Sequence, residues 1–372
     1  MKILRKLYTT IQRTLFPMLE EEIGELTETQ KFFAAVVEMI KPSRFITPEL
    51  SWSGQGRPMK EREYVLRAFI LKAIYNFPTT KLLIENLKTN PTLRRLCGWE
   101  YGSKIPSEAT FSRIFTVLAE TQLPNEIHKA MIEEHHKAKL AGHNSSDSTA
   151  VNGREKSCRK NTPKAKVKKK RGRKSKAELA AINELEQNEI KTRRLELQGN
   201  RPLNENLDDL PAGCDWGAKR NSQGKQESWK GYKLHVSTVD GGIPVAAILT
   251  SASVHDSQAA IPLMQMSKER LGFYCYDLMD SAYDAKEIHD FSRNMGRVPI
   301  IDPNKRRGDE VPLEPAKKMR YNERTAAERT NSDLKDNHGG KNIRVKGNSK
   351  VFCHLMFGVI AITAKQLFNM LL

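Results

Sequence analysis

The chain has 372 residues, of which 38% are hydrophobic and 28% charged, and its formal net charge is +18 at pH 7. The length allows two or three domains with a substantial core, and no apolar run approaches the roughly 20 residues of a membrane span. Its first 16 residues lack the continuous apolar stretch of a signal peptide, so we expect no membrane partner. The five cysteines form no CxxC pair, which favours free thiols in a reducing compartment over a zinc ribbon or a disulfide framework.

The first part of the chain, to residue 136, is expected to form an all-α N-terminal domain. Apolar residues at helical spacing predict helices at 29–41, 60–77, 80–88 and 92–97, and from a cap at Ser107 to about residue 120. Short helices joined by tight turns are compatible with a helix-turn-helix, although any small helical bundle has the same spacing.

From residue 137 to the end, the pattern predicts an α/β domain. Strands are expected at 143–151, 229–239, 243–251, 273–280 and 298–301, with the second and third joined by a hairpin at Asp240-Gly241-Gly242. Helices alternate with the later strands, and an apolar helix at 351–371 closes the chain. The order predicts a mixed five-stranded sheet with helices.

An insertion at residues 152–211 separates the first two predicted strands. Between Arg154 and Lys174 it carries twelve Lys or Arg and one acid, Glu155, and so supplies +11 of the net charge. Such a block is typical of a segment that contacts a polyanion, and nucleic acid is the interpretation we favour over a solvated linker. Its densest basic residues are Lys168, Lys169, Lys170, Arg171 and Arg173. A charged helix is expected at 177–197, which makes the insertion an arm or lobe on one sheet edge.

One helix face near the C-terminus carries the most informative pattern. In a helix over residues 321–335, a turn of about 100° per residue places the side chains within an arc of about 60°. They are Tyr321, Arg324, Glu328 and Lys335. A carboxylate can hold a divalent metal, and cations with a phenol suit a phosphate backbone. The alternative is a solvated face on which Arg324 and Glu328 form a surface pair.

Three carboxylates are candidate metal ligands. Asp147 on the first strand and Asp280 at the end of the fourth are neighbours if these strands pair at the sheet centre, and Glu328 can lie across the same sheet end. Converging carboxylates require a compensating charge, which two Mg²⁺ ions about 3.5–4 Å apart provide, and Mn²⁺ is an acceptable substitute. Asp256 is expected to be a helix N-cap instead, and Asp277 to face the opposite side of the sheet.

Several segments together resemble bacterial insertion-sequence transposases of the IS4-like DDE group. YNERTAAERTNSDLK matches the group's Y-x2-R-x3-E-x6-K signature without a gap. NSSDSTAV and LMDSAYDA resemble the motifs of the first and second aspartates, and WKGYKLHV and ILTSASVHDSQ resemble the segment between them. Residues 27–120 are similar to the helical N-terminal domain of many such transposases, whereas 152–211 matches nothing in the group.

The resemblance implies an RNase H-like catalytic core in which Asp147, Asp280 and Glu328 bind the metal ions. It also implies that Tyr321, Arg324 and Lys335 hold DNA near the cut end, and that the N-terminal domain binds the DNA ends. The expected partners are the terminal inverted repeats, target DNA and a second copy of the chain, in a bacterial cytoplasm with the nucleoid. Two alternatives remain open at this point. They are a metal-dependent endonuclease that cuts without joining and a catalytically inactive DNA-binding protein.

Overall fold

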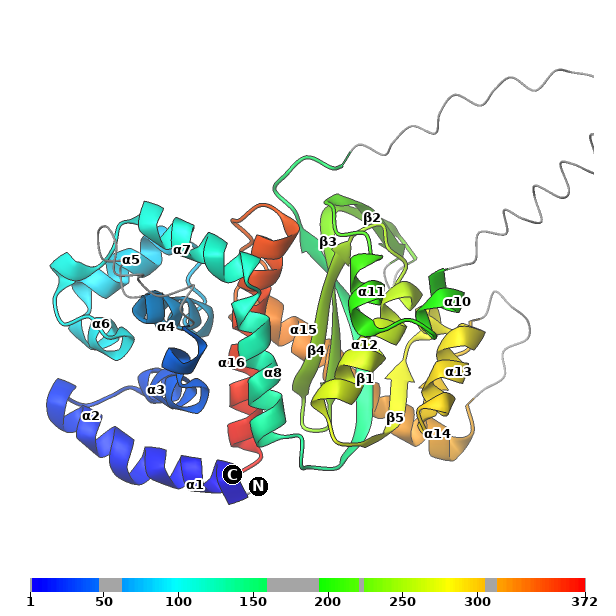
Figure 1. Ribbon diagram of the computed structural model, residues 1–372, viewed down its shortest axis with the longest axis horizontal. Coiled ribbons are helices and arrows are strands. Elements are labelled where there is room, and N and C mark those ends of the chain that lie inside the picture. Colours follow the sequence, from blue (N-terminus) through cyan, green and yellow to red (C-terminus); the bar gives the residue numbers. More distant parts are fainter. Residues whose placement is uncertain (1, 47–61, 159–193, 221–223, 305–312, 372) are drawn as a thin grey trace, which may run out of the picture.

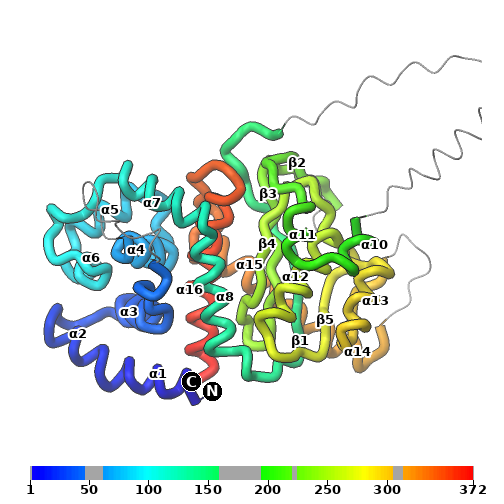
Figure 2. Tube along the Cα trace, viewed as in Figure 1, coloured from blue at the N-terminus to red at the C-terminus, as the bar shows by residue number. Residues whose placement is uncertain are grey.

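The computed structural model describes residues 2–46, 62–158, 194–220, 224–304 and 313–371. A helical region formed by the N-terminal part of the chain lies beside a sheet with helices, and helix α16 (Asn348–Asn369) runs between the two (Figures 1 and 2). This arrangement confirms the coarse prediction of a mixed α/β region preceded by helices.

The helical region contains the predicted helices together with further segments that had no predicted range. Its elements are α1 (Lys2–Thr10), the π-helical turn Ile11–Leu15, α2 (Phe16–Ile23), α3 (Glu28–Ile40), a 3₁₀ turn Pro42–Phe45, α4 (Arg62–Ile74), α5 (Thr80–Thr89), α6 (Pro91–Cys97), a 3₁₀ turn Gly102–Lys104, α7 (Glu108–Glu120) and α8 (Leu123–His135). A capping box between Thr27 and Gln30 fixes the start of α3. The segments before residue 24 were missed because their charges interrupt the apolar pattern.

The sheet has six strands among the described residues, so the prediction of five was wrong. They are β1 (Ala141–Asn152), β2 (Asp215–Arg220), β3 (Gln226–Val239), β4 (Ile243–Ser251), β5 (Tyr274–Met279) and β6 (Val298–Ile301). The order is β2-β3-β1-β5-β6, and β4 pairs with β3. The additional strand, β2, is a short polar segment with no apolar alternation, and its pairing with β3 holds it in the sheet.

Helices cover both faces of this sheet. α12 (Ser257–Arg270) packs Leu263 and Met266 against Ala246 and Ile248 of β4. The opposite face, with Leu234 and Val236 of β3, packs against α16 and α15 (Thr325–Asn337). The remaining elements are α10 (Arg194–Gln198), α11 (Leu203–Asp208), the 3₁₀ turn Ser281–Tyr283, α13 (Lys286–Asn294), α14 (Pro315–Tyr321) and the 3₁₀ turn Asn322–Arg324. The predicted charged helix at 177–197 falls mostly outside the described residues.

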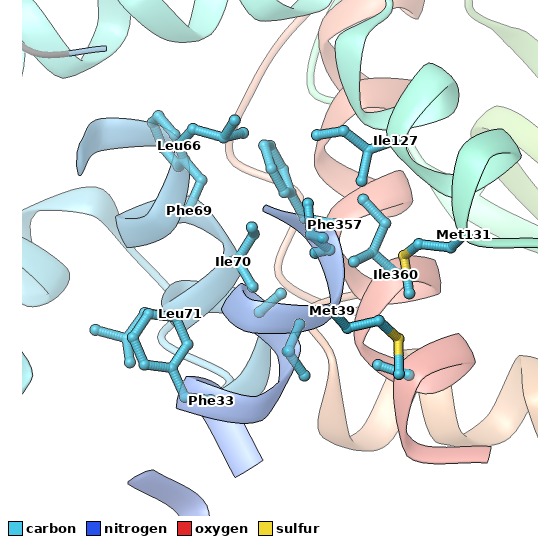
Figure 3. Close-up of a cluster of buried hydrophobic side chains, with 14 of the residues drawn as sticks. Phe33, Met39, Leu66, Phe69, Ile70, Leu71, Ile127, Met131, Phe357 and Ile360 are labelled. Atoms are coloured by element: carbon cyan, nitrogen blue, oxygen red, sulfur yellow. The ribbon is translucent and has the colours of Figure 1, made fainter. Parts of the chain in front are cut away.

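Helix α16 joins the two parts of the molecule. Its Phe357 and Ile360 lie among Phe33, Leu66 and Ile127 of the helical region (Figure 3). The same apolar cluster continues to Ile243 and Val245 of β4. By length and composition α16 is the one helix of the described residues that qualifies as a membrane span, but 83% of its most apolar window is buried inside the protein. It is therefore positioned as a core helix that fixes the sheet against the N-terminal helices.

Candidate active site

Asp147 and Asp280 come together at the centre of the sheet. β1 is antiparallel to β3 and parallel to β5, and the last residues of β1 and β5 that pair are Ser145 and Leu278. Continuing this register by two residues would bring Asp147 opposite Asp280. The two carboxyl groups lie near enough to act on each other, because the charge of Asp147 raises the pKa of Asp280. Asp280 immediately follows β5, and its carboxylate accepts a 3.0 Å hydrogen bond from the backbone N–H of Ala282. The predicted pairing of these two strands is confirmed.

Burial makes both carboxyl groups costly to ionise. It raises the pKa of Asp280 to about 6, and the charges of Asp147 and Asp256 act in the same direction. It likewise raises the pKa of Asp147, with the hydrogen bond from Asn331 acting against the rise. The fully buried Tyr283 lies within electrostatic reach of all three aspartates, and its hydroxyl has no partner among the described residues. Two carboxyl groups of this kind are oxygen donors that suit a divalent cation, and the Arg324 guanidinium acts on both as a counter-charge that lowers their pKa.

The last helical segment is not the single helix that the sequence predicted. α14 ends at Tyr321, a 3₁₀ turn covers residues 322–324, and α15 begins at Thr325. The side chains nevertheless follow one another along a stripe. The guanidinium of Arg324 lies 5.5 Å from the ring centre of Tyr321 and donates a 2.6 Å hydrogen bond to Glu328. The 3₁₀ turn therefore leaves Arg324 in contact with both Tyr321 and Glu328, although the geometry differs from that of a continuous helix.

Glu328 is held by Arg324 rather than by the other two carboxylates. Its side chain is 49% exposed and pairs with the guanidinium, whose side chain is 18% exposed. Glu328 is still near enough to raise the pKa of Asp147 by charge repulsion. Within the described ranges, no three His, Cys, Asp or Glu side chains are grouped closely enough to hold a metal ion. The structure thus brings two of the three predicted ligands together, whereas the third, Glu328, is paired with Arg324.

Asn331 contacts the site and was not singled out from the sequence. Its Nδ2 donates a 3.0 Å hydrogen bond to Oδ2 of Asp147, and the residue is 5% exposed. It lies three residues after Glu328, on the side of α15 that faces the sheet. A helical projection that included amides beside the charged residues would have found it.

Asp256 occupies the N-cap position of α12, as predicted, but its side chain does not cap the helix. It stands before the helix but makes no capping hydrogen bond there. Its carboxylate instead accepts a 2.8 Å hydrogen bond from Nζ of Lys233. Burial acts to raise the pKa of Asp256, but the nearby His235 and Lys233 hold it below its usual value. A lysine that reaches this carboxylate across the sheet outweighs a local capping bond, which the sequence pattern alone does not reveal. Asp277, by contrast, is buried on the other face and accepts from Ser292, as predicted.

Basic side chains extend from the site along α15. Lys335 is half-buried, and burial together with the charges of Lys219 and Lys341 lowers its pKa. Burial raises the pKa of Tyr321 to about 12, so its phenol remains a hydrogen-bond donor at neutral pH. The predicted DNA contacts Lys168, Lys169, Lys170, Arg171 and Arg173 lie outside the described residues.

Comparison with protein families identifies two regions of the chain. Residues 195–364 match a family described as a transposase DDE domain, and residues 21–116 match a family described as a transposase domain. The first match begins after Asp147, so that aspartate is placed by the register of β1 against β5 rather than by the match. Searches of curated proteins and of solved structures found no match. The two family matches indicate a DDE transposase family, with similarity to the DDE domain over residues 195–364 and to a second transposase domain over residues 21–116.

Proposed function

We propose that this chain is the transposase of a bacterial insertion sequence of the IS4-like group, with an RNase H-like catalytic core. It binds the terminal inverted repeats of its element, cleaves a DNA strand there and joins the freed 3′-OH to target DNA. The observation that supports this most is the proximity of Asp147 and Asp280 at paired central strands, beside the helix that carries Arg324 and Glu328.

In this proposal Asp147, Asp280 and Glu328 hold the metal, as two Mg²⁺ ions for which Mn²⁺ substitutes. When bound, the metal supplies an activated water and charge stabilisation for in-line displacement at phosphorus. Asp280 is oriented by the N–H of Ala282 and Asp147 by Asn331. These hydrogen bonds orient the two carboxylates before DNA binds. Supporting residues commonly orient metal ligands in this way.

Arg324 has a second task in this proposal. While it is paired with Glu328 its guanidinium is largely covered, and a DNA phosphate offers it an alternative bidentate partner. When the phosphate replaces Glu328 as the partner of Arg324, Glu328 is free to move toward Asp147. DNA binding and completion of the ligand set are thereby coupled. Tyr321 and Lys335 extend the phosphate-binding stripe on either side.

The partners follow from the reaction. Two inverted repeats must be held together, so we expect a homodimer on DNA, in the bacterial cytoplasm with the nucleoid. The N-terminal helices are proposed to recognise the repeats, and α7 offers Ser112 and Arg113 as exposed side chains. The basic residues 168–173 are proposed to contact the backbone of the same DNA.

The test is cleavage and strand transfer with Mg²⁺ on DNA that carries the element's own ends. Glu328→Gln keeps the shape of the side chain but removes its charge, and Glu323→Gln is the matched control on an exposed neighbouring position. The proposal expects cleaved and joined products from the wild type and the control, and neither from Glu328→Gln. Cleavage without joining would support the endonuclease alternative, and full activity of Glu328→Gln would mean that another carboxylate is the ligand.

A further inference from the structure

A cavity of about 470 Å³ lies apart from the candidate active site, between the helical region and α16. α4, α5, α7 and α16 line it together with the segment that follows α15. Its apolar wall includes Phe69, Phe115 and Phe357, whose rings contact one another. The ring centres of Phe69 are 4.9 Å from Phe115 and 5.7 Å from Phe357, and Figure 3 shows Phe69 and Phe357 reaching toward each other from α4 and α16. The volume falls within the range of about 300–1,000 Å³ that is usual for small-molecule sites.

Lys72 lines this cavity as a largely buried cation. It is 8% exposed, and no hydrogen bond or ion pair to it is found in the part of the chain that the structure describes. Burial lowers its pKa to about 8. The neighbouring His354 does not offset the charge, because burial lowers its pKa to about 4 and it bonds to the carbonyl of Gly339. An unpaired ammonium in an apolar wall is costly, and an anion in the cavity would remove that cost.

Two arginines complete a positive lining. Arg154 and Arg344 are both exposed, and Arg154 donates a 2.9 Å hydrogen bond to the backbone carbonyl of Arg344, which fixes the two chain segments to each other. Among the described residues that line the cavity there is one acid, Glu108, which is exposed in the first turn of α7. Three cations therefore face one acid around an aromatic wall.

We infer that this cavity binds a single nucleotide unit, with its phosphate on Lys72, Arg154 and Arg344 and its base against the phenylalanine wall. Arginine and lysine suit a phosphate, and aromatic side chains accept any base by contact with its face. An isolated inorganic anion would leave the apolar wall unused, and an apolar ligand would leave Lys72 unpaired. A nucleotide satisfies both.

A line of cations indicates where that nucleotide comes from. Lys335 on α15 lies within electrostatic reach of both Asp147 and Lys341. Lys341 lies between Gly339 and Arg344, which both line the cavity. Resting on the proposed function, we assign the ligand as an unpaired nucleotide of the bound DNA, although a free nucleotide has the same chemistry.

The first arm of the test uses the full-length protein in EDTA, where no cleavage step is needed. The probe is the 5′-monophosphate of 2-aminopurine deoxyribonucleoside, followed by fluorescence anisotropy. Lys72→Met keeps the length of the side chain and removes the buried charge, and Lys88→Met is the matched control on the exposed side of α5. We expect saturable binding by the wild type and the control, and affinity lower by about tenfold or more in Lys72→Met. Arg344→Gln, at an exposed position, provides a second variant whose folding is not at risk, and we expect weaker binding from it as well.

The second arm uses a DNA duplex with one unpaired 2-aminopurine nucleotide. A fluorescence change that saturates in the wild type and is lost in Lys72→Met identifies DNA as the source, whereas binding in the first arm alone identifies a free nucleotide. The inference is overturned if neither probe binds saturably, or if folded Lys72→Met and Arg344→Gln bind both probes as the wild type does. Because the first arm is free of metal, its result stands or falls separately from the cleavage that tests the proposed function.

Discussion

Arg324 donates a 2.6 Å hydrogen bond to Glu328, and Asp147 lies close enough for both charges to affect its pKa. Both residues of this ion pair belong to the helix face that the sequence predicted as a metal and DNA site. Its two side chains are partly exposed, so the pair is worth on the order of 0.2–1 kcal/mol. A bond of that strength is replaceable by a phosphate and a metal ion.

Removal of the Arg324 charge is expected to separate metal binding from DNA cleavage. In Arg324→Gln, Glu328 no longer has a competing cation, so the affinity for Mn²⁺ without DNA should rise about two- to fivefold. Cleavage of DNA should fall on the order of 10–100-fold, because a charged phosphate contact is lost. Calorimetric Mn²⁺ titration and a cleavage assay measure the two effects. Arg329→Gln, at an exposed position on the same helix, is the control, and equal Mn²⁺ affinity in all three proteins would contradict the account.

Asp280→Asn is expected to stabilise the metal-free protein. The folded-state pKa of about 6 lies above the ordinary aspartate value of 3.8, so the folded protein holds this proton more tightly than the unfolded chain. The stabilisation from that proton is complete below about pH 4 and is lost as the pH rises through about 6. The variant should therefore equal the wild type near pH 4 and exceed it by on the order of 1–3 kcal/mol above pH 7.

Thermal melting in EDTA between pH 4 and 8 measures this difference. Asp208→Asn, at an exposed position on α11, is the matched control and should melt as the wild type does. Added Mg²⁺ should raise the melting temperature of the wild type more than that of Asp280→Asn, because only the wild type keeps both adjacent carboxylates. A lower melting temperature for Asp280→Asn at pH 7 would show that burial does not oppose ionisation here.

Asn331→Ala is expected to reduce activity with little effect on DNA binding. The side chain holds Asp147 through a 3.0 Å hydrogen bond. Loss of such a supporting bond is expected to lower metal affinity or activity by about 10–100-fold. Ser332→Ala changes the exposed neighbour and controls for effects on α15 itself. Cleavage rates at several Mg²⁺ concentrations, with DNA affinity measured separately, check this prediction. Unchanged rates at limiting Mg²⁺ would exclude a supporting role for Asn331.

The basic segment at residues 159–174 is expected to add affinity for DNA of any sequence. Deletion of residues 159–174 should weaken DNA binding and reduce the salt slope by about 0.9 for each phosphate contact that is lost. Titrations at several salt concentrations measure the slope. A slope equal to that of the full chain would assign the segment to contact with a partner subunit instead.

Much of the sheet was predictable because its strands carry their own signals. The alternating or continuous apolar segments at β3, β4 and β5 and the hairpin glycines Gly241 and Gly242 are local features. The pairing of β1 with β5, on which the proximity of Asp147 and Asp280 depends, was a condition of the prediction and is present in the structure. β2 was missed because its polar residues are held by pairing with β3 alone. The same limit applies to Asp256. Its helix-capping position is local, whereas its bond to Lys233 depends on how α12 packs across the sheet.

The predicted helix at 321–335 shows the other limit of sequence reasoning. Periodicity placed the four side chains on one face, but it could not reveal the 3₁₀ turn at 322–324 or the pairing of Arg324 with Glu328. The cavity beside Lys72 was likewise not predictable, because its lining comes from helices and loops far apart in the chain.

The most direct test of the central claim is a metal-rescue measurement on Asp280. A thiolate binds Mg²⁺ poorly and the softer Mn²⁺ better, so Asp280→Cys should lose cleavage in Mg²⁺ and regain it in Mn²⁺ if this side chain contacts the metal. Asp256→Cys is the control, because that carboxylate is bound to Lys233 and any loss of activity should be the same in both metals. Selective rescue of Asp280→Cys by Mn²⁺ is the predicted result. Equal loss of activity of Asp280→Cys in Mg²⁺ and Mn²⁺, or rescue of Asp256→Cys instead, would contradict the assignment of Asp280 as a metal ligand.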